Sequence, residues 1–150
     1  MKQFFGSSQR GDLKEAVRGL QNPQLILLMS NQEQFETHVQ ELERLYPRVP
    51  SIGCIGMSYD TKIVEKGVGV VAFCEGVSAV ANVLEQVSTM PVKYIERLQR
   101  DVRMVSASQK DTICLDFCSG NDACVLTTIY TVLKPLHISL VGGTGDGGKV

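Results

Sequence analysis

The chain has 150 residues, enough for one ordinary domain whose hydrophobic core needs neither disulfides nor a metal to fold. Its 43% hydrophobic and 21% charged residues are typical of a globular protein in water. The net charge is −1 and both signs are interspersed, so neither nucleic acid nor a membrane surface is expected as a partner.

Three short apolar runs in the first half predict β-strands at residues 2–6, 25–29 and 51–56. The middle run is continuous, which favours a strand that is buried on both faces. The segments between the runs have helical patterns, so two strand-helix-strand units follow each other. Such units predict parallel strands that are joined by right-handed crossovers.

Two helices are expected between these strands. Asp12 is followed three residues later by Glu15, a capping-box pattern that opens the first helix, and Asn22-Pro23 ends it. Ser30 and Glu33 form a second capping-box pattern at the start of the next helix. The apolar stripe of this second helix consists of Phe35, Val39, Leu42 and Tyr46.

The pattern changes after residue 56. Residues 57–66 are a polar loop, and the two apolar runs that follow, at 67–74 and 77–83, are separated by Glu75-Gly76. This spacing predicts a β-hairpin, and the sheet is therefore expected to be mixed.

The rest of the chain alternates helices and strands. Helices are expected at residues 89–105 and 121–133, and strands at 112–117 and 137–141. Asn121 is the expected N-cap of the second of these helices. The whole pattern predicts an α/β fold, a three-layer sandwich around a mixed, largely parallel sheet, in a single domain over residues 1–150.

The expected location of the protein is the cytoplasm. Residues 1–8 lack the apolar centre and the cleavage site of a secretory signal, and no apolar stretch approaches the ~20 residues that span a bilayer. An odd number of cysteines suits a reducing compartment. They are Cys54, Cys74, Cys114, Cys118 and Cys124.

A ligand site is expected where parallel strands end, because helices diverge there and leave a crevice. Three predicted strands end in small polar segments, at residues 54–58, 119–122 and 142–146, where glycines let backbone N–H groups face a bound group. Taken singly, each segment is better explained as a tight turn, but three such segments on one predicted edge of the sheet favour a functional interpretation. The residues we expect to contact a ligand are Cys54, Ser58, Ser119, Asn121, Thr144 and Asp146.

Catalysis by a cysteine or by a metal is disfavoured. A catalytic cysteine needs a nearby base, but His38 falls on the polar side of its predicted helix and His137 begins a strand at the edge opposite the candidate loops. Cys114, Cys118 and Cys124 have no paired C-x-x-C spacing, so core packing explains them better than a metal site. No metal and no cofactor are expected.

Two further alternatives remain open at this point. Residues 142–148 are rich in glycine but lack the Gly-Lys-Ser/Thr ending of a P-loop, so nucleotide binding is a weak alternative. Asp122 and Asp146 could approach each other as acid and base, which would make the protein a hydrolase or a transferase. Asp122 is more simply an early helical residue that is stabilised by the helix dipole.

Several segments resemble the N-terminal region of the FIST sensory domain family, in the family's order. Pro50-Ser51-Ile52-Gly53-Cys54 is similar to its P-x-I-G-C-S-T segment, although Ile55-Gly56 stands where the family usually has Ser-Thr. Residues 140–146 are similar to its V-G-G-x-A-G-D segment. The other matching pieces are the strand at 25–29, the strand at 68–73 and Leu115-Asp116-Phe117-Cys118-Ser119-Gly120.

The resemblance implies a sensory module and not an enzyme. Members of this family are thought to sense small ligands, including amino acids, and they occur fused to signalling outputs. The implied partners are a small-molecule ligand and a downstream output domain; a homo-oligomer is a third expectation, since an edge strand could pair with a copy of itself. The family domain normally continues past residue 146, so we expect this chain to be a fragment or a minimal version.

Overall fold

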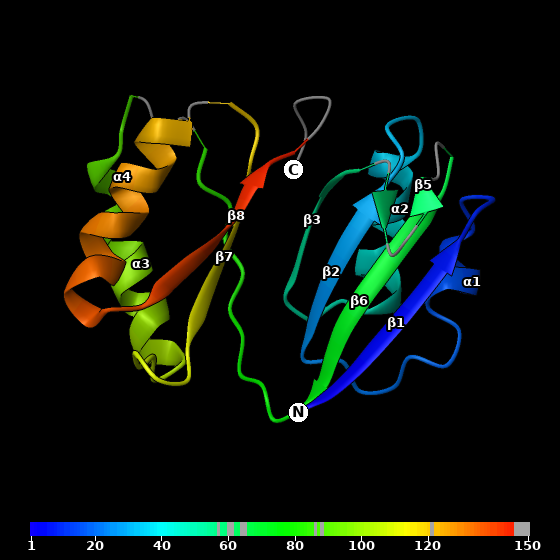
Figure 1. Cartoon of the computed structure of the whole chain (residues 1–150), viewed down its shortest axis with the longest axis horizontal. Helices are drawn as coiled ribbons and strands as arrows, with labels where there is room; N and C mark the ends of the chain where they lie inside the picture. The colour runs from blue at the N-terminus through cyan, green and yellow to red at the C-terminus, as the bar shows by residue number, and fades with distance from the viewer. Residues whose placement is uncertain are drawn as a thin grey trace. The chain divides into compact units, whose positions relative to one another are not determined.

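The computed structural model shows two compact units: the first contains Met1–Ala81 and Gly145, and the second contains Asn82–Thr144. Both are drawn in Figure 1. The structure describes residues 1–56, 58–59, 62–63, 66–85, 87, 89–120 and 122–145, and side chains at 58, 59, 62, 63 and 122 are not described.

The first unit contains a four-stranded sheet with the order β1-β6-β2-β3 (Figure 1). Its strands are β1 (Lys2–Ser8), β2 (Leu25–Ser30), β3 (Ser51–Ile55) and β6 (Val68–Glu75). β2 and β3 are parallel, and β6 is antiparallel to both β1 and β2. β1, β2 and β3 therefore run in the same direction, as the two strand-helix-strand units predicted, and the sheet is mixed.

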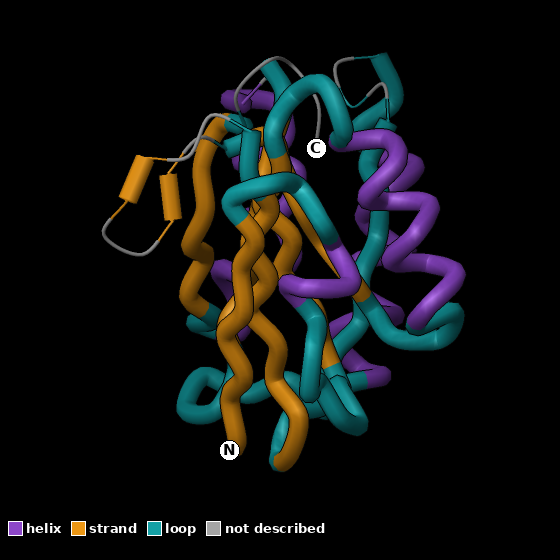
Figure 2. The backbone as a smooth tube through the Cα atoms, turned by 90° about the vertical axis from the view of Figure 1, so that its right-hand side faces the viewer, coloured by secondary structure: helices purple, strands orange, loops and turns teal. Residues whose placement is uncertain are grey.

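The expected hairpin between residues 67–74 and 77–83 does not form. β6 lies instead between β1 and β2 and pairs with each of them over most of its length. Residues 77–83 contain no helix or strand, and Gly76 turns the chain with a φ of +72°. The two long ladders satisfy the backbone groups of β6 on both sides, which a local hairpin could do on one side only. A separate short hairpin, β4 (Ser58–Tyr59) with β5 (Lys62–Ile63), precedes β6 (Figure 2).

The first helix, α1 (Leu13–Ala16), begins where the capping box predicted. Asp12 is its N-cap, and its carboxylate accepts a hydrogen bond from the backbone N–H of Glu15 at 3.2 Å. The Glu15 carboxylate does not return to Asp12; it accepts from the Ser8 hydroxyl at 2.7 Å. The helix is shorter than expected: its C-cap is Val17, the Arg18 N–H bonds back to the Glu15 carbonyl at 3.2 Å, and Gly19 then turns the chain with a φ of +87°.

The second helix, α2 (Phe35–Leu45), corrects two expectations. Ser30 is not an N-cap but the last residue of β2, and the helix begins five residues later without a side-chain cap. The buried face includes Phe35, His38 and Leu42, whereas Val39 is 39% exposed. His38 therefore does not lie on the polar side of its helix.

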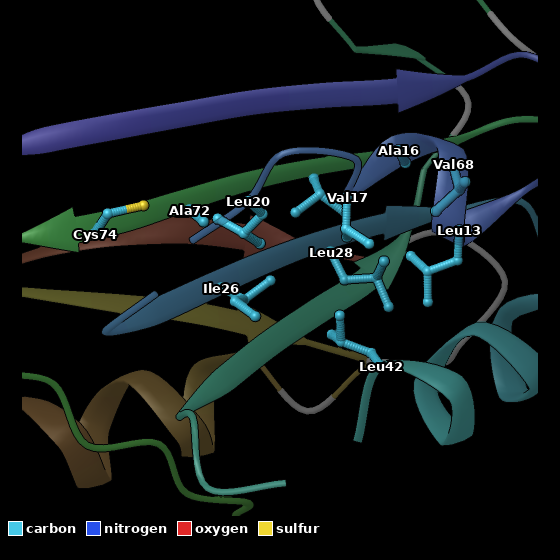
Figure 3. Close-up of a cluster of buried hydrophobic side chains, with 11 residues drawn as sticks. Leu13, Ala16, Val17, Leu20, Ile26, Leu28, Leu42, Val68, Ala72 and Cys74 are labelled. Atoms are coloured by element: carbon cyan, nitrogen blue, oxygen red, sulfur yellow. The ribbon is translucent and has the colours of Figure 1, made fainter. Parts of the chain in front are cut away.

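Both helices cover the same face of the sheet. The buried side chains of β2 and β6 alternate along each strand and meet those of α1, α2 and the turn after α1 (Figure 3). This core consists of Leu13, Ala16, Val17, Leu20, Ile26, Leu28, Leu42, Val68, Val70, Ala72 and Cys74. This alternation means that only one face of β2 is fully buried, whereas the continuous apolar run had predicted burial of both faces.

The second unit is a parallel two-stranded sheet with helices packed against it. Its elements are α3 (Val92–Met104), β7 (Ile113–Cys118), α4 (Asp122–Leu133), the 3₁₀ turn η1 (Lys134–Leu136) and β8 (Ser139–Thr144). These bounds match the expected helices and strands to within a few residues. The core of the unit gathers Val87, Tyr94, Cys118, Val125, Ile129, Leu133 and Ile138.

The structure confirms the α/β class and the mixed sheet. Each unit by itself has two layers, and the three-layer arrangement of the whole chain stays a prediction. Among the residues that the structure describes, no helix is both long enough and apolar enough to cross a bilayer.

Candidate functional site at the carboxyl ends of β7 and β8

The second unit places two of the expected site residues at one edge. β7 and β8 are parallel, and their register pairs Cys118 with Thr144. Ser119 directly follows Cys118, so Ser119 and Thr144 both lie where the two strands end. Both residues are exposed. This edge is the place where α/β sheets bind ligands, because the chain leaves each strand there to enter a helix or loop.

The backbone at this edge leaves room for a bound group. Gly120 has a φ of +79°, and α4 begins two residues later, at Asp122. A Cβ atom built on Gly120 or on Gly143 would meet no other heavy atom within 4 Å. The open backbone therefore lies beside the start of a twelve-residue helix, whose first-turn N–H groups have no acceptor within the helix itself.

The chemistry that this edge offers is that of hydroxyl and amide groups. Ser119 and Thr144 can each donate and accept a hydrogen bond, and a helix N-terminus favours a negative charge. No group of three metal-ligating side chains exists among the described residues. These hydroxyl and N–H groups can form hydrogen bonds with a small polar or anionic group.

The other expected site residues are placed differently. Cys54 lies in β3 of the first unit, next to the strand's last residue, and its partner on β2 is Met29. Ser58 lies in β4, without a described side chain. Asn121 and Asp146 fall outside the described residues, and so does the suggested Asp122–Asp146 carboxylate pair.

Two shallow hollows in the second unit lie away from this edge. They follow the sides of α4 and its exit into η1, and none of the expected site residues lines them. His137 lies before the first residue of β8, at the end of the strand opposite the candidate site, as expected.

The partly buried cysteines are poor nucleophiles. Burial, together with the smaller effect of the nearby Asp116 carboxylate, raises the pKa of the Cys114 thiol to about 11. Burial also raises the pKa of Cys54. A raised thiol pKa leaves little thiolate at neutral pH, and the thiolate is the reactive form.

Alkylation should separate these thiols. At pH 8 only about one Cys114 side chain in a thousand carries a thiolate, so N-ethylmaleimide is expected to modify the exposed Cys124 first and to leave Cys114 unmodified. Peptide mass spectrometry after timed quenching measures the order. Modification of Cys114 as fast as Cys124 in the folded chain would contradict the raised pKa; equal rates in urea serve as the control.

A second polar cluster, at the carboxyl end of β2, was missed in the sequence. The Ser30 hydroxyl lies 2.6 Å from Nδ1 of His38, and Nε2 of His38 lies 2.9 Å from the carbonyl oxygen of Gly11. A carbonyl only accepts, so Nε2 carries the hydrogen. Two features of the sequence could have indicated this cluster: the polar pair Ser30-Asn31 directly after a buried strand, and a histidine eight residues after Ser30.

This cluster has a structural role. Ser30 and His38 are 0% and 2% exposed, so no substrate can reach the hydroxyl. The side-chain Nδ2 of Asn31 donates to the carbonyls of Lys66 and Gly67, each at 3.2 Å, and its side-chain Oδ1 accepts from the Gln34 N–H at 3.0 Å. The cluster ties the loop before α1 and the turn before β6 to the end of β2.

Comparison with protein families matches residues 24–150 to the FIST N domain. The match runs through both compact units. Comparisons with curated proteins and with solved structures gave no match. The family match covers most of the chain and agrees with the α/β fold, and the chain therefore belongs to the FIST N domain family, a family of sensory-type domains.

Proposed function

We propose that this chain is a small-ligand-binding sensory module whose ligand occupies the carboxyl edge of β7 and β8. The observation that carries the proposal is the register that pairs Cys118 with Thr144, since it brings Ser119 and Thr144 together beside the start of α4. Membership of a sensory-type family favours binding over catalysis.

The ligand class that fits this edge is an amino acid or a small carboxylate. The first-turn N–H groups of α4 favour a carboxylate, and the hydroxyls of Ser119 and Thr144 can bond its oxygen atoms or an ammonium group. Asn121 and Asp146, which flank the two strand ends in sequence, are proposed as further contacts. Neither a metal nor a cofactor is needed for this kind of binding.

Ligand binding would select one arrangement of the segments after β7 and β8, and α4 is the element through which that arrangement could reach an output partner. A ligand shifts such an equilibrium only by its difference in affinity for the two states. The proposed partner is a downstream signalling domain or protein in the cytoplasm. We also propose a second copy of the chain as a partner, in a homo-oligomer.

A thermal-shift screen of amino acids and small carboxylates tests the proposal. A ligand that binds only the folded chain stabilises it by about 2.7 kcal/mol at one hundred times its Kd. Ser119→Ala and Thr144→Val are each expected to weaken binding about tenfold, which lowers that stabilisation to about 1.4 kcal/mol at the same ligand concentration. Asn121→Ala and Asp146→Ala should weaken binding in the same way.

Ser139→Ala is the matched control, because Ser139 is an exposed hydroxyl at the other end of β8. The ligand-induced rise in the melting temperature of this variant should equal that of the unmodified chain. Full ligand-induced shifts in the Ser119 and Thr144 variants would place the ligand elsewhere. Mass spectrometry of the recovered compound distinguishes the enzyme alternative, since a sensor returns the ligand intact and a hydrolase or transferase returns a product.

A further inference from the structure

Helix α4 is unusually apolar for a helix with an exposed face. No charged residue occurs from Ala123 through Leu133. One face is buried in the core of the second unit, where Val125 and Ile129 pack. On a neighbouring side of the helix, about 100° round from this face, Leu126 is 37% exposed and Tyr130 is 47% exposed. A helix that is apolar on all sides is normally covered on all sides.

The threonines of α4 add to this apolar character. The Thr127 hydroxyl donates to the Ala123 carbonyl at 2.7 Å, and the Thr131 hydroxyl donates to the Thr127 carbonyl at 2.9 Å. Each hydroxyl therefore already has a hydrogen-bond acceptor within the helix, although both residues are exposed. Covering them with another protein would leave no hydroxyl donor unsatisfied, so their burial costs little.

These residues form one continuous surface with the turn that follows. One hollow, of about 600 Å³, is lined by Leu126, Thr127, Tyr130, Thr131 and Lys134. The next, of about 390 Å³, shares Thr131 and extends over Leu136 toward α3. Leu136 is 40% exposed. We call the set Leu126, Thr127, Tyr130, Thr131 and Leu136 the α4 surface; α3 and α4 lie side by side in Figure 1.

The charges that border the α4 surface are positive. Arg103 on α3 lines the second hollow and Lys134 lines the first. No acidic side chain lines either hollow, and neither cation has an ion-pair partner among the described residues. A partner for this surface should therefore bring apolar side chains to the centre and carboxylates to the rim.

We propose that the α4 surface docks an amphipathic helix of a partner protein, with an apolar stripe flanked by Asp and Glu. The surface follows α4 from Leu126 into η1, about three helical turns, which is the length over which a helix presents residues at i, i+3, i+4 and i+7. A second copy of the chain fits less well, because it presents the same two cations and no lining carboxylate to meet them. This surface is separate from the ligand edge, and the proposal does not depend on ligand binding.

The test uses the full chain and two labelled peptides that differ only in charge. Both are 16-residue helices with leucine at i, i+3, i+4 and i+7, and their flanks carry either glutamate or lysine. Fluorescence anisotropy is expected to give a Kd at least about tenfold lower for the glutamate peptide. The double variant Arg103→Glu with Lys134→Glu should reverse that preference.

Tyr130→Ser should weaken binding of the glutamate peptide about tenfold, because aromatic residues at the centre of an interface contribute most. Val92→Ser is the matched control, since Val92 is 74% exposed on α3 but lines neither hollow. Circular dichroism checks that each variant is folded. Equal affinity for the two peptides, or no binding of either, would overturn the proposal. So would a dimer in sedimentation that Tyr130→Ser disrupts, because it would identify a second copy as the occupant.

Discussion

Replacing Gly142 by alanine is expected to lower the free energy of unfolding by about 3 kcal/mol, whereas the same change at Gly143 is expected to lower it by less than about 0.5 kcal/mol. A Cβ atom on Gly142 would overlap the carbonyl group of Asp116 on the neighbouring strand β7. A Cβ atom on Gly143 would meet nothing within 4 Å. Urea denaturation followed by circular dichroism measures both variants.

The two glycines are adjacent on β8, so they form a matched pair with the same composition and strand context. Neither glycine has a positive φ, so alanine is compatible with the local backbone conformation at both positions. The difference between the variants reports only how closely β7 and β8 approach. Equal stability of the two variants would show that Asp116 and Gly142 are not neighbours, and the register on which the ligand edge rests would then fail.

Replacing His38 by alanine is expected to cost about 3 kcal/mol of stability. The side chain is 2% exposed, and its removal leaves a cavity between α2 and the end of β2. It also leaves the Ser30 hydroxyl and the Gly11 carbonyl without the contacts of 2.6 Å and 2.9 Å that they make to the imidazole. Unpaired buried polar groups each cost roughly 1–3 kcal/mol.

Val39→Ala is the control for this variant, because Val39 is the next residue of α2 and is 39% exposed. Its loss of contacts is offset by the higher helix propensity of alanine, and a change of less than about 0.5 kcal/mol is expected. Chemical denaturation at one pH measures both. A His38→Ala chain as stable as Val39→Ala would mean that the imidazole does not connect α2 to the loop before α1.

Local patterns were predictable because the interactions behind them span only a few residues. The N-cap of α1 is one example, since Asp12 and Glu15 are three positions apart and their hydrogen bond needs no tertiary contact. The ends of α4 and β7 follow equally from nearby glycines, prolines and apolar periodicity. The same kind of pattern failed at Ser30, where a capping box was predicted and a buried strand end was found.

The failure at Ser30 has a tertiary cause. The hydroxyl of Ser30 lies 2.6 Å from Nδ1 of His38, and this contact exists only because α2 packs against the end of β2. Packing also decided which side of α2 is buried, so a polar residue, His38, occupies a position that periodicity assigned to the solvent. A hydrophobic pattern alone does not predict the burial of a polar side chain whose hydrogen-bonding groups find partners in the interior.

The candidate site divides in the same way. The sequence shows that polar residues, Ser119 and Thr144, end the two strands. Whether these two residues lie at the same edge depends on the register of β7 and β8, which only the structure gives. The α4 surface likewise needed the structure, because an uncharged helix can be fully buried or half exposed with the same sequence.

By itself the sequence determined the α/β class, the family, most helix and strand positions and the polar segments that end the strands, because periodicity, caps and turns are local. Only the tertiary structure decided that β6 lies between β1 and β2 instead of forming a hairpin, that His38 is buried, and that the outer face of α4 is exposed. Each of these depends on groups far apart in the chain competing for the same hydrogen bonds and the same core.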